Sequence, residues 1–132
     1  MNTVWQVETY MLADRYSEAV ALARQALEVF KENKDRGSEA WLRYLLAEIL
    51  VRRHPVAFSQ AEESYRAASL LAHELGMRPL EAHCNLGLGQ MHARSKSTCM
   101  AQSHIGTAAA LYRTMHMSYW IDKSAMLLTA IS

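Results

Sequence analysis

Apolar residues recur at helical spacing along most of the chain. From Tyr16 they return every three or four residues as far as Phe30, and charged residues occupy the opposite face. A second pattern of this kind covers residues 38–53. It predicts a well-buried helix, and we expect Gly37 to end the helix before it.

The same reading predicts further helices downstream. His54-Pro55 breaks the second pattern, because proline disfavours a helical residue before it and cannot donate a backbone hydrogen bond. Ser59 and Glu62 have the spacing of a capping box, and Gly76 suits the end of the helix that follows.

Two helices and a final one complete the pattern. Pro79 suits the first turn of a helix that continues to about Arg94. After the polar stretch 95–98 another helix runs to about Met115, and Ser118 is a candidate cap for the last one. With a helix at the N-terminus, the chain is predicted to have seven helices and no strand.

Composition supports this assignment. The 132 residues fit a single domain or a short repeat array. Ala, Leu and Met together number 44, against 10 Val and Ile, and there are only 5 Gly and 2 Pro. Because this mixture favours helices over strands, we predict an all-α fold.

Three of the predicted segments repeat one pattern at nearly constant intervals. Each has a small residue, a second position four residues later and a small residue three residues after that. The aligned triplets are Ala19-Ala23-Ala26, Ala61-Tyr65-Ala68 and Ala101-Ile105-Ala108. Antiparallel helical hairpins that stack on one another explain the repeat, with units at about 2–36, 38–76 and 79–116 and a capping helix over 118–131.

The triplets resemble those of the tetratricopeptide repeat (TPR). Leu88-Gly89 matches the Leu-Gly pair of that repeat's first helix, and 14–19 matches its turn. The resemblance implies an alpha-alpha superhelix that binds proteins in its concave groove. The units exceed the length that is usual for this repeat, about 34 residues. The first unit also lacks a Leu-Gly pair, and Ala23 replaces a large residue.

A second resemblance covers most of the chain. Residues 74–80, 82–89, 110–113 and Tyr119-Trp120 are similar to the C-terminal repeats of bacterial signalling proteins that couple a cyclase-like domain to a predicted ATPase. The resemblance implies a sensory or partner-binding scaffold. The metal-binding carboxylates of the cyclase and the phosphate loop of the ATPase have no counterpart here, so neither activity transfers.

Charge and cysteine content exclude some function classes. The net charge is +1, so composition gives no support to nucleic-acid or membrane binding. No 18 consecutive residues are apolar, and no basic start precedes an apolar core at the N-terminus. Two cysteines do not make a disulfide framework, and a cytoplasmic location is the default expectation.

No motif for catalysis or cofactor binding is convincing. Gly87-Leu88-Gly89 lies in an apolar helical segment, and His92 stands where a nucleotide loop needs its third glycine. No two of the six histidines are three or four residues apart, which disfavours a metal site. Cys84 and His83 are adjacent and point about 100° apart on a helix, so they do not face one another as a nucleophile and its base must. We therefore expect no enzyme activity and no cofactor.

The most plausible working surface is the groove lined by the first helix of each pair. Trp41 and Tyr44 are candidate anchors for an apolar part of a partner, and Glu8 and Glu48 would favour Lys or Arg beside it. The alternative, that Trp41 and Tyr44 are simply buried between helices, stays open. The full candidate set is Glu8, Met11, Trp41, Tyr44, Glu48, His83, Leu86 and Gln90.

Two functional classes remain open. The first is a non-enzymatic module that binds a protein or peptide segment. The second is a self-associating structural module, a homodimer formed through exposed end helices, for which Tyr119, Trp120 and Ile121 are the candidate residues.

Overall fold

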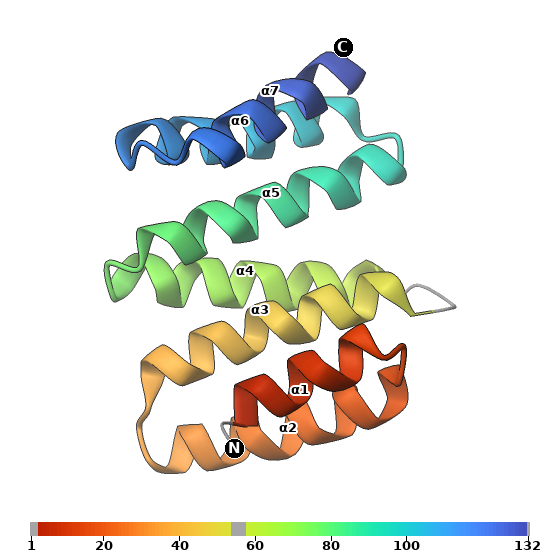
Figure 1. The fold of residues 1–132 in the computed structure, drawn as a ribbon, viewed down its shortest axis with the longest axis vertical. Helices are drawn as coiled ribbons and strands as arrows, with labels where there is room; N and C mark the ends of the chain where they lie inside the picture. Colours follow the sequence, from red (N-terminus) through yellow and green to blue (C-terminus); the bar gives the residue numbers. More distant parts are fainter. Residues whose placement is uncertain (1–2, 54–57, 132) are drawn as a thin grey trace.

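The prediction of an all-α fold is confirmed. The computed structural model describes residues 3–53 and 58–131, and in these ranges the chain forms seven α-helices and no strand (Figure 1). The helices are α1 (Thr3–Leu12), α2 (Tyr16–Glu32), α3 (Arg36–Arg52), α4 (Phe58–Glu74), α5 (Arg78–Arg94), α6 (Thr98–Thr114) and α7 (Ser118–Ile131).

Consecutive helices pack as antiparallel hairpins that stack along the long axis of the molecule. The pairs α1/α2, α3/α4 and α5/α6 form the hairpins, and α7 packs on α6 at the C-terminal end. None of the helices that the structure describes is both long enough and apolar enough to cross a membrane.

The regular spacing of the stack comes from helices and turns of nearly constant length. Helices α2 to α6 are equally long, and the turns at 33–35, 75–77 and 95–97 are equally long as well. The connection between α3 and α4, at 53–57, is slightly longer. Each helix pair with its turns therefore spans the same stretch of sequence, apart from this longer connection. The nearly constant interval between the repeated triplets follows from that arrangement.

The short turns share one backbone geometry. The third turn residue donates its N–H to the carbonyl five residues back, as in Asp35 to Phe30 (2.9 Å) and Ser97 to His92 (2.8 Å). The middle residue has a positive φ, which is typical of a helix ending in a Schellman motif. The five middle residues are Asp14, Lys34, Gly76, Lys96 and His116.

Several predicted boundaries are confirmed, and three are corrected. Gly76 ends α4 with φ 71°, and Pro79 lies in the first turn of α5, which ends at Arg94. Gly37 was expected to end a helix, yet it lies in the first turn of α3, and Lys34 takes the left-handed position instead.

Both predicted serine caps are wrong, because both serines are already helical. Ser59 is already helical in α4, so the capping box with Glu62 does not form there. Ser118 is the first helical residue of α7, because the N–H of Ile121 bonds to the carbonyl of Met117. The predicted break at His54-Pro55 lies outside the described residues.

The repeated triplets form the contacts of the even-numbered helices with the core. The first and third residues of each triplet are alanines no more than 5% exposed. Gly87 and Gly89 of α5 allow close approach on both sides, because a β-carbon at Gly87 would lie 2.6 Å from the Tyr65 ring of α4. The Gly-Leu-Gly segment therefore packs helices together, as predicted.

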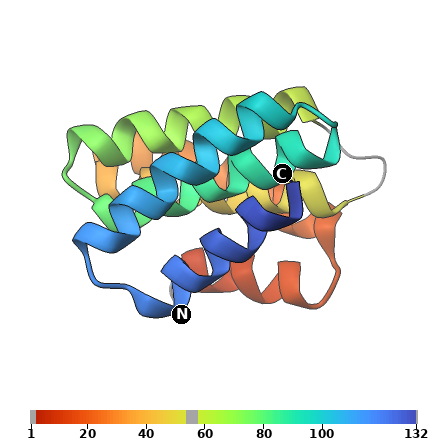
Figure 2. The same ribbon diagram turned by 90° about the horizontal axis from the view of Figure 1, so that it is seen from above.

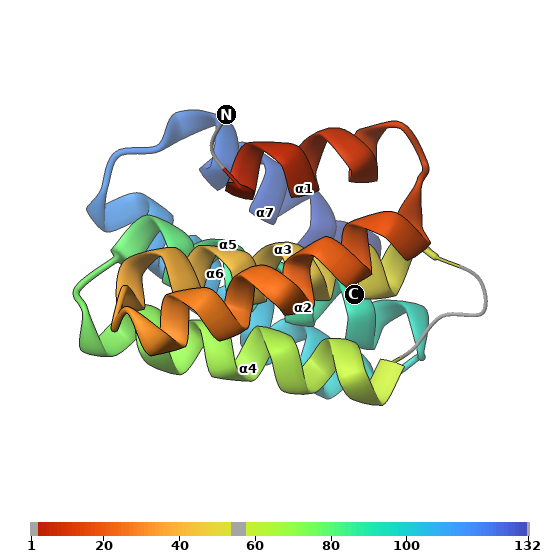
Figure 3. The same ribbon diagram turned by 90° about the horizontal axis from the view of Figure 1, so that it is seen from below.

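The stack curves toward the odd-numbered helices. Helix α3 contacts α1 and α5, and α5 contacts α7, whereas α2, α4 and α6 do not contact one another in the part of the chain that the structure describes. The end-on views in Figures 2 and 3 show the helix layers. Because the odd-numbered helices lie closer together, their free side is the inside of the curve.

Candidate functional site

The inside of the curve carries two recurring rows of side chains. Trp41, His83 and Lys123 occupy the same position in α3, α5 and α7, because their spacing equals that of the aligned alanines of the triplets. The second row consists of Glu8 in α1, Glu48 in α3 and Gln90 in α5, each one helical hairpin after the other. We define the concave surface as the side chains that the odd-numbered helices leave at least partly exposed in and beside these rows: Glu8, Trp41, Tyr44, Glu48, His83, Gln90, Tyr119, Trp120 and Lys123.

Aromatic rings cross the concave surface without interruption. The Trp41 ring meets the Tyr44 ring edge-on at 6.1 Å between centroids, and Tyr44 lies 6.3 Å from the imidazole of His83. His83 in turn lies 4.6 Å from Trp120, and Tyr119 lies 5.1 Å beyond it. Three separate helices thus contribute to one row of contacting rings.

Trp41 and Tyr44 are exposed to different extents. Trp41 keeps 38% of its surface exposed, whereas Tyr44 is half-buried and packs against the core. Burial, followed by the nearby charge of Glu48, raises the pKa of Tyr44 and keeps its hydroxyl protonated. Of the two predicted anchors, Trp41 is therefore the more accessible.

Glu48 already has partners within the chain. Its carboxylate accepts a hydrogen bond of 2.9 Å from the hydroxyl of Tyr65 and lies 3.5 Å from the guanidinium of Arg52. The expectation that Glu48 would favour a basic residue of a partner is weakened, since its charge is largely compensated.

A pocket of about 240 Å³ lies beside Glu48, between α3 and α5. Glu48 and Gln90 both line it, as expected from their equivalent positions in α3 and α5. It also contains Arg52 and Arg94, neither of which was in the predicted set. Arg94 donates a hydrogen bond of 3.2 Å to the carbonyl of Val51.

Met11 and Leu86 do not belong to the accessible surface. They were expected to line the groove, but they are only 6% and 4% exposed. Met11 belongs to the core around α1 to α3, and Leu86 packs with Ile105 and Tyr112 of α6. Both side chains fill space between helices, which removes them from the candidate set.

The three residues predicted for self-association differ in exposure. Tyr119 is 68% exposed, whereas Trp120 and Ile121 are half-buried and pack against the core formed with α6. Met126, which the prediction did not include, is 73% exposed on the same helix.

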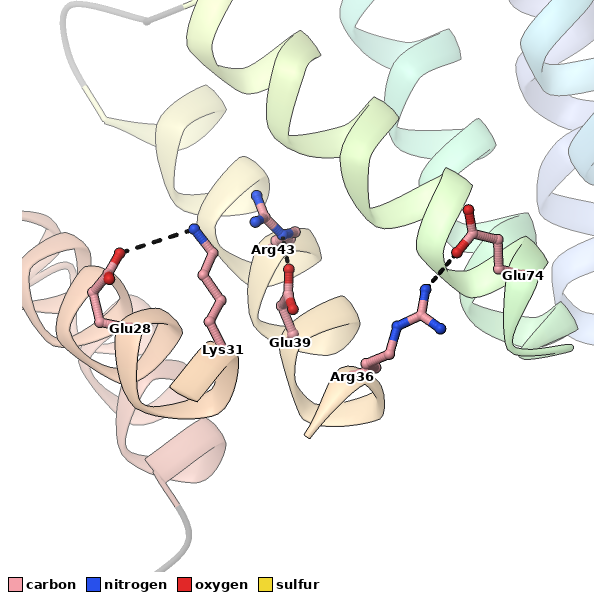
Figure 4. A network of polar contacts seen from close by, with 6 residues as sticks. All are labelled: Glu28, Lys31, Arg36, Glu39, Arg43 and Glu74. Carbon is pink, nitrogen blue, oxygen red and sulfur yellow. Dashed lines mark hydrogen bonds and ion pairs between the residues drawn. The ribbon is translucent and has the colours of Figure 1, made fainter. Parts of the chain in front are cut away.

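A separate hollow of about 500 Å³ lies on the opposite side of the molecule, between α2 and α4 above α3. Two of its cations are already paired, because Lys31 lies 3.9 Å from Glu28 and Arg43 bonds to Glu39 at 2.8 Å (Figure 4). Nearby, Arg36 and Glu74 join α3 to α4 in the same figure. Arg24 and Glu63 also line the hollow, so the opposite charges around it nearly balance.

The remaining reactive groups do not converge. Cys84 is fully buried, and burial raises the pKa of its thiol and keeps it protonated. Within residues 3–53 and 58–131, no three His, Cys, Asp or Glu side chains are placed to hold one metal ion.

Comparison with known proteins adds no family assignment. No protein-family model matches the sequence, and the curated proteins include no significant match to it. The candidate surface is therefore argued from the geometry of this chain.

Proposed function

We propose that this chain is a non-enzymatic interaction module that binds a segment of a partner protein on its concave surface. The row of rings from Trp41 through His83 to Trp120 carries the proposal. Partly exposed aromatic side chains on a rigid scaffold offer a large contact area at a low entropic cost, and they are enriched at the centres of protein interfaces.

The stacked architecture supports the same function. Repeat proteins bind extended partners on the concave surface that the curvature of the stack creates. We further propose that the module is a TPR-like repeat region with a sensory or regulatory role in a bacterial signalling protein, as the resemblance of residues 74–80, 82–89, 110–113 and Tyr119-Trp120 to such regions suggests. In that role it would act through binding alone.

The test is selection of binding peptides from a displayed random-peptide library, followed by measurement of their affinity for two variants. Trp41→Ala removes the accessible ring of the concave surface. Phe58→Ala is the matched control, because Phe58 is 36% exposed but lies on α4, outside the concave layer. We expect Trp41→Ala to weaken binding at least tenfold, since aromatic hot spots contribute about 2 kcal/mol or more, whereas Phe58→Ala leaves affinity unchanged.

Unchanged binding of the Trp41→Ala protein, with its helicity intact by circular dichroism, would remove the concave surface from the proposal. Equal loss of binding in both variants, each folded by the same measurement, would also contradict it, because Phe58 lies outside the concave layer.

A second candidate function is self-association through α7. Tyr119 and Met126 are 68% and 73% exposed on α7, a helix that has only two charged residues, Asp122 and Lys123. Exposed apolar surface of this kind is typical of protein interaction sites. Light scattering after size exclusion tests this candidate, because a monomer mass at every concentration would contradict it.

A further inference from the structure

Lys123 and His83 are two hydrogen-bond donors that lie next to the aromatic rings of the concave surface. Lys123 of α7 places its ammonium 5.3 Å from the centre of the Trp120 ring, and that ring touches the imidazole of His83. Burial lowers the pKa of His83, and the charge of Lys123 lowers it further. The two side chains therefore share one environment on the α5–α7 half of the surface.

His83 has one nitrogen that remains available. Its Nδ1 atom lies 2.7 Å from the hydroxyl of Tyr112, which is fully buried. Burial raises the pKa of Tyr112, and we assign its hydroxyl as the donor to Nδ1. The proton of the neutral imidazole is then on Nε2, which makes no hydrogen bond to the residues that the structure describes.

Lys123 likewise has no acidic partner among the described residues, in contrast to the other half of the surface. There the carboxylate of Glu48 is bonded to Tyr65 and lies beside Arg52. Asp122 directly precedes Lys123, so on a helix it points about 100° away from Lys123. The α5–α7 half therefore has donors and positive charge without an acceptor.

We propose that the partner segment bound here carries an Asp or Glu side chain next to an aromatic or aliphatic one. The carboxylate would accept hydrogen bonds from the Lys123 ammonium and His83 Nε2, and the apolar neighbour would pack on Trp120, with the rest of the segment continuing over Tyr44 toward Trp41. This inference rests on the proposed function and specifies the chemistry of its partner. It reverses the sequence-based expectation of a basic segment, because a cation beside Lys123 would be repelled.

The test uses the same random-peptide selection, with peptides displayed so that their C-termini are blocked. We expect the selected peptides to be enriched in Asp or Glu beside an aromatic or aliphatic residue. Lys123→Gln should weaken their binding about two- to fivefold, the range expected for a partly exposed ion pair. Lys31→Gln is the control, because it removes the same charge from α2 on the other side of the molecule.

A pH titration separates His83 from Lys123. A bound carboxylate raises the pKa of His83 above that of the free protein, so by linkage binding should tighten as the pH falls through the bound-state pKa. The dependence should lie above about pH 4, because the peptide carboxylates themselves protonate near that pH. His83→Gln should remove this dependence, whereas the exposed His73→Gln should retain it.

The outcomes distinguish the two levels of the proposal. Peptides that depend on Trp41 but are apolar or basic, and that bind Lys123→Gln as well as the wild type, would overturn this inference and leave the proposed function standing. Peptides whose binding does not depend on Trp41 would contradict the proposed function itself.

Discussion

Gly89 of α5 lies directly against Ile105 of α6, so closely that a β-carbon at position 89 would come within 2.4 Å of the Ile105 Cγ1 atom. The carbonyl oxygen of Ala101 lies 3.2 Å from the same point. The absence of a side chain at Gly89 is therefore what allows α5 and α6 to pack at their observed distance.

Gly89→Ala should lower the free energy of unfolding by about 1–3 kcal/mol, the usual range for an overpacked core. Gly106→Ala in α6 is the control, since a β-carbon there meets nothing within 4 Å. The control should be neutral or stabilise by up to about 1 kcal/mol through helix propensity. Urea denaturation measures both, and equal stability of the two variants would contradict the proposed packing.

Substitutions at two turn residues with positive φ should change the free energy of unfolding in opposite directions. Lys96 has φ 64° and Gly76 has φ 71° at equivalent places in their turns. Lys96→Gly should raise the free energy of unfolding by about 0.5–1 kcal/mol, because glycine adopts this conformation without steric cost. Gly76→Lys should lower it by a similar amount. Thermal unfolding of both variants checks the prediction, and two shifts of the same sign would refute it.

The hydrogen bond between Tyr65 and Glu48 predicts that removing the Tyr65 hydroxyl lowers the free energy of unfolding. Tyr65 is 1% exposed, and its hydroxyl donates to the carboxylate of Glu48. Tyr65→Phe should lower the free energy of unfolding by about 1–2 kcal/mol, because Glu48 then loses a charge-assisted hydrogen bond. Tyr119→Phe, at a 68% exposed ring, should change it little in the same denaturation experiment.

His104 predicts a dependence of stability on pH. Burial lowers its pKa in the folded protein, and His92 and Arg66 lower it further, against a smaller opposing effect of Glu62. The unfolded chain therefore binds more protons below its own histidine pKa of about 6.5, and the free energy of unfolding should fall as the pH decreases from there toward the folded-state pKa.

Replacing His104 by Gln should reduce this slope. Urea denaturation at a series of pH values from about 7.5 to 5 measures the slopes. A His104→Gln protein with the wild-type slope would show that His104 is not the group responsible.

Much of the fold follows from local patterns in the sequence. The triplets at Ala61 and Ala101 predict the even-numbered helices and their stacking, because small residues are required wherever two helices approach closely. The helix ends were harder to predict. Lys34, Lys96 and His116 adopt a conformation usually associated with glycine, so these three helix ends lack the residue that marks the end of α4 at Gly76.

The candidate site was predicted in part. Position within each helix correctly placed Trp41, Glu48, His83 and Gln90 on the odd-numbered helices. Helical periodicity does not show which of two adjacent faces a neighbouring hairpin covers, so Met11 and Leu86 were wrongly assigned to the groove. The approach of Trp120 and Lys123 to His83 depends on the packing of α7 against α5, which the pattern of a single helix does not contain.

The most direct test of the proposed interaction surface is to map backbone amide chemical-shift changes by NMR as a selected peptide is added to the intact chain. We predict that the changes centre on Trp41, Tyr44, His83 and Trp120 along the concave surface. Changes centred instead on α2, α4 and α6, with the ring row unaffected, would contradict the account.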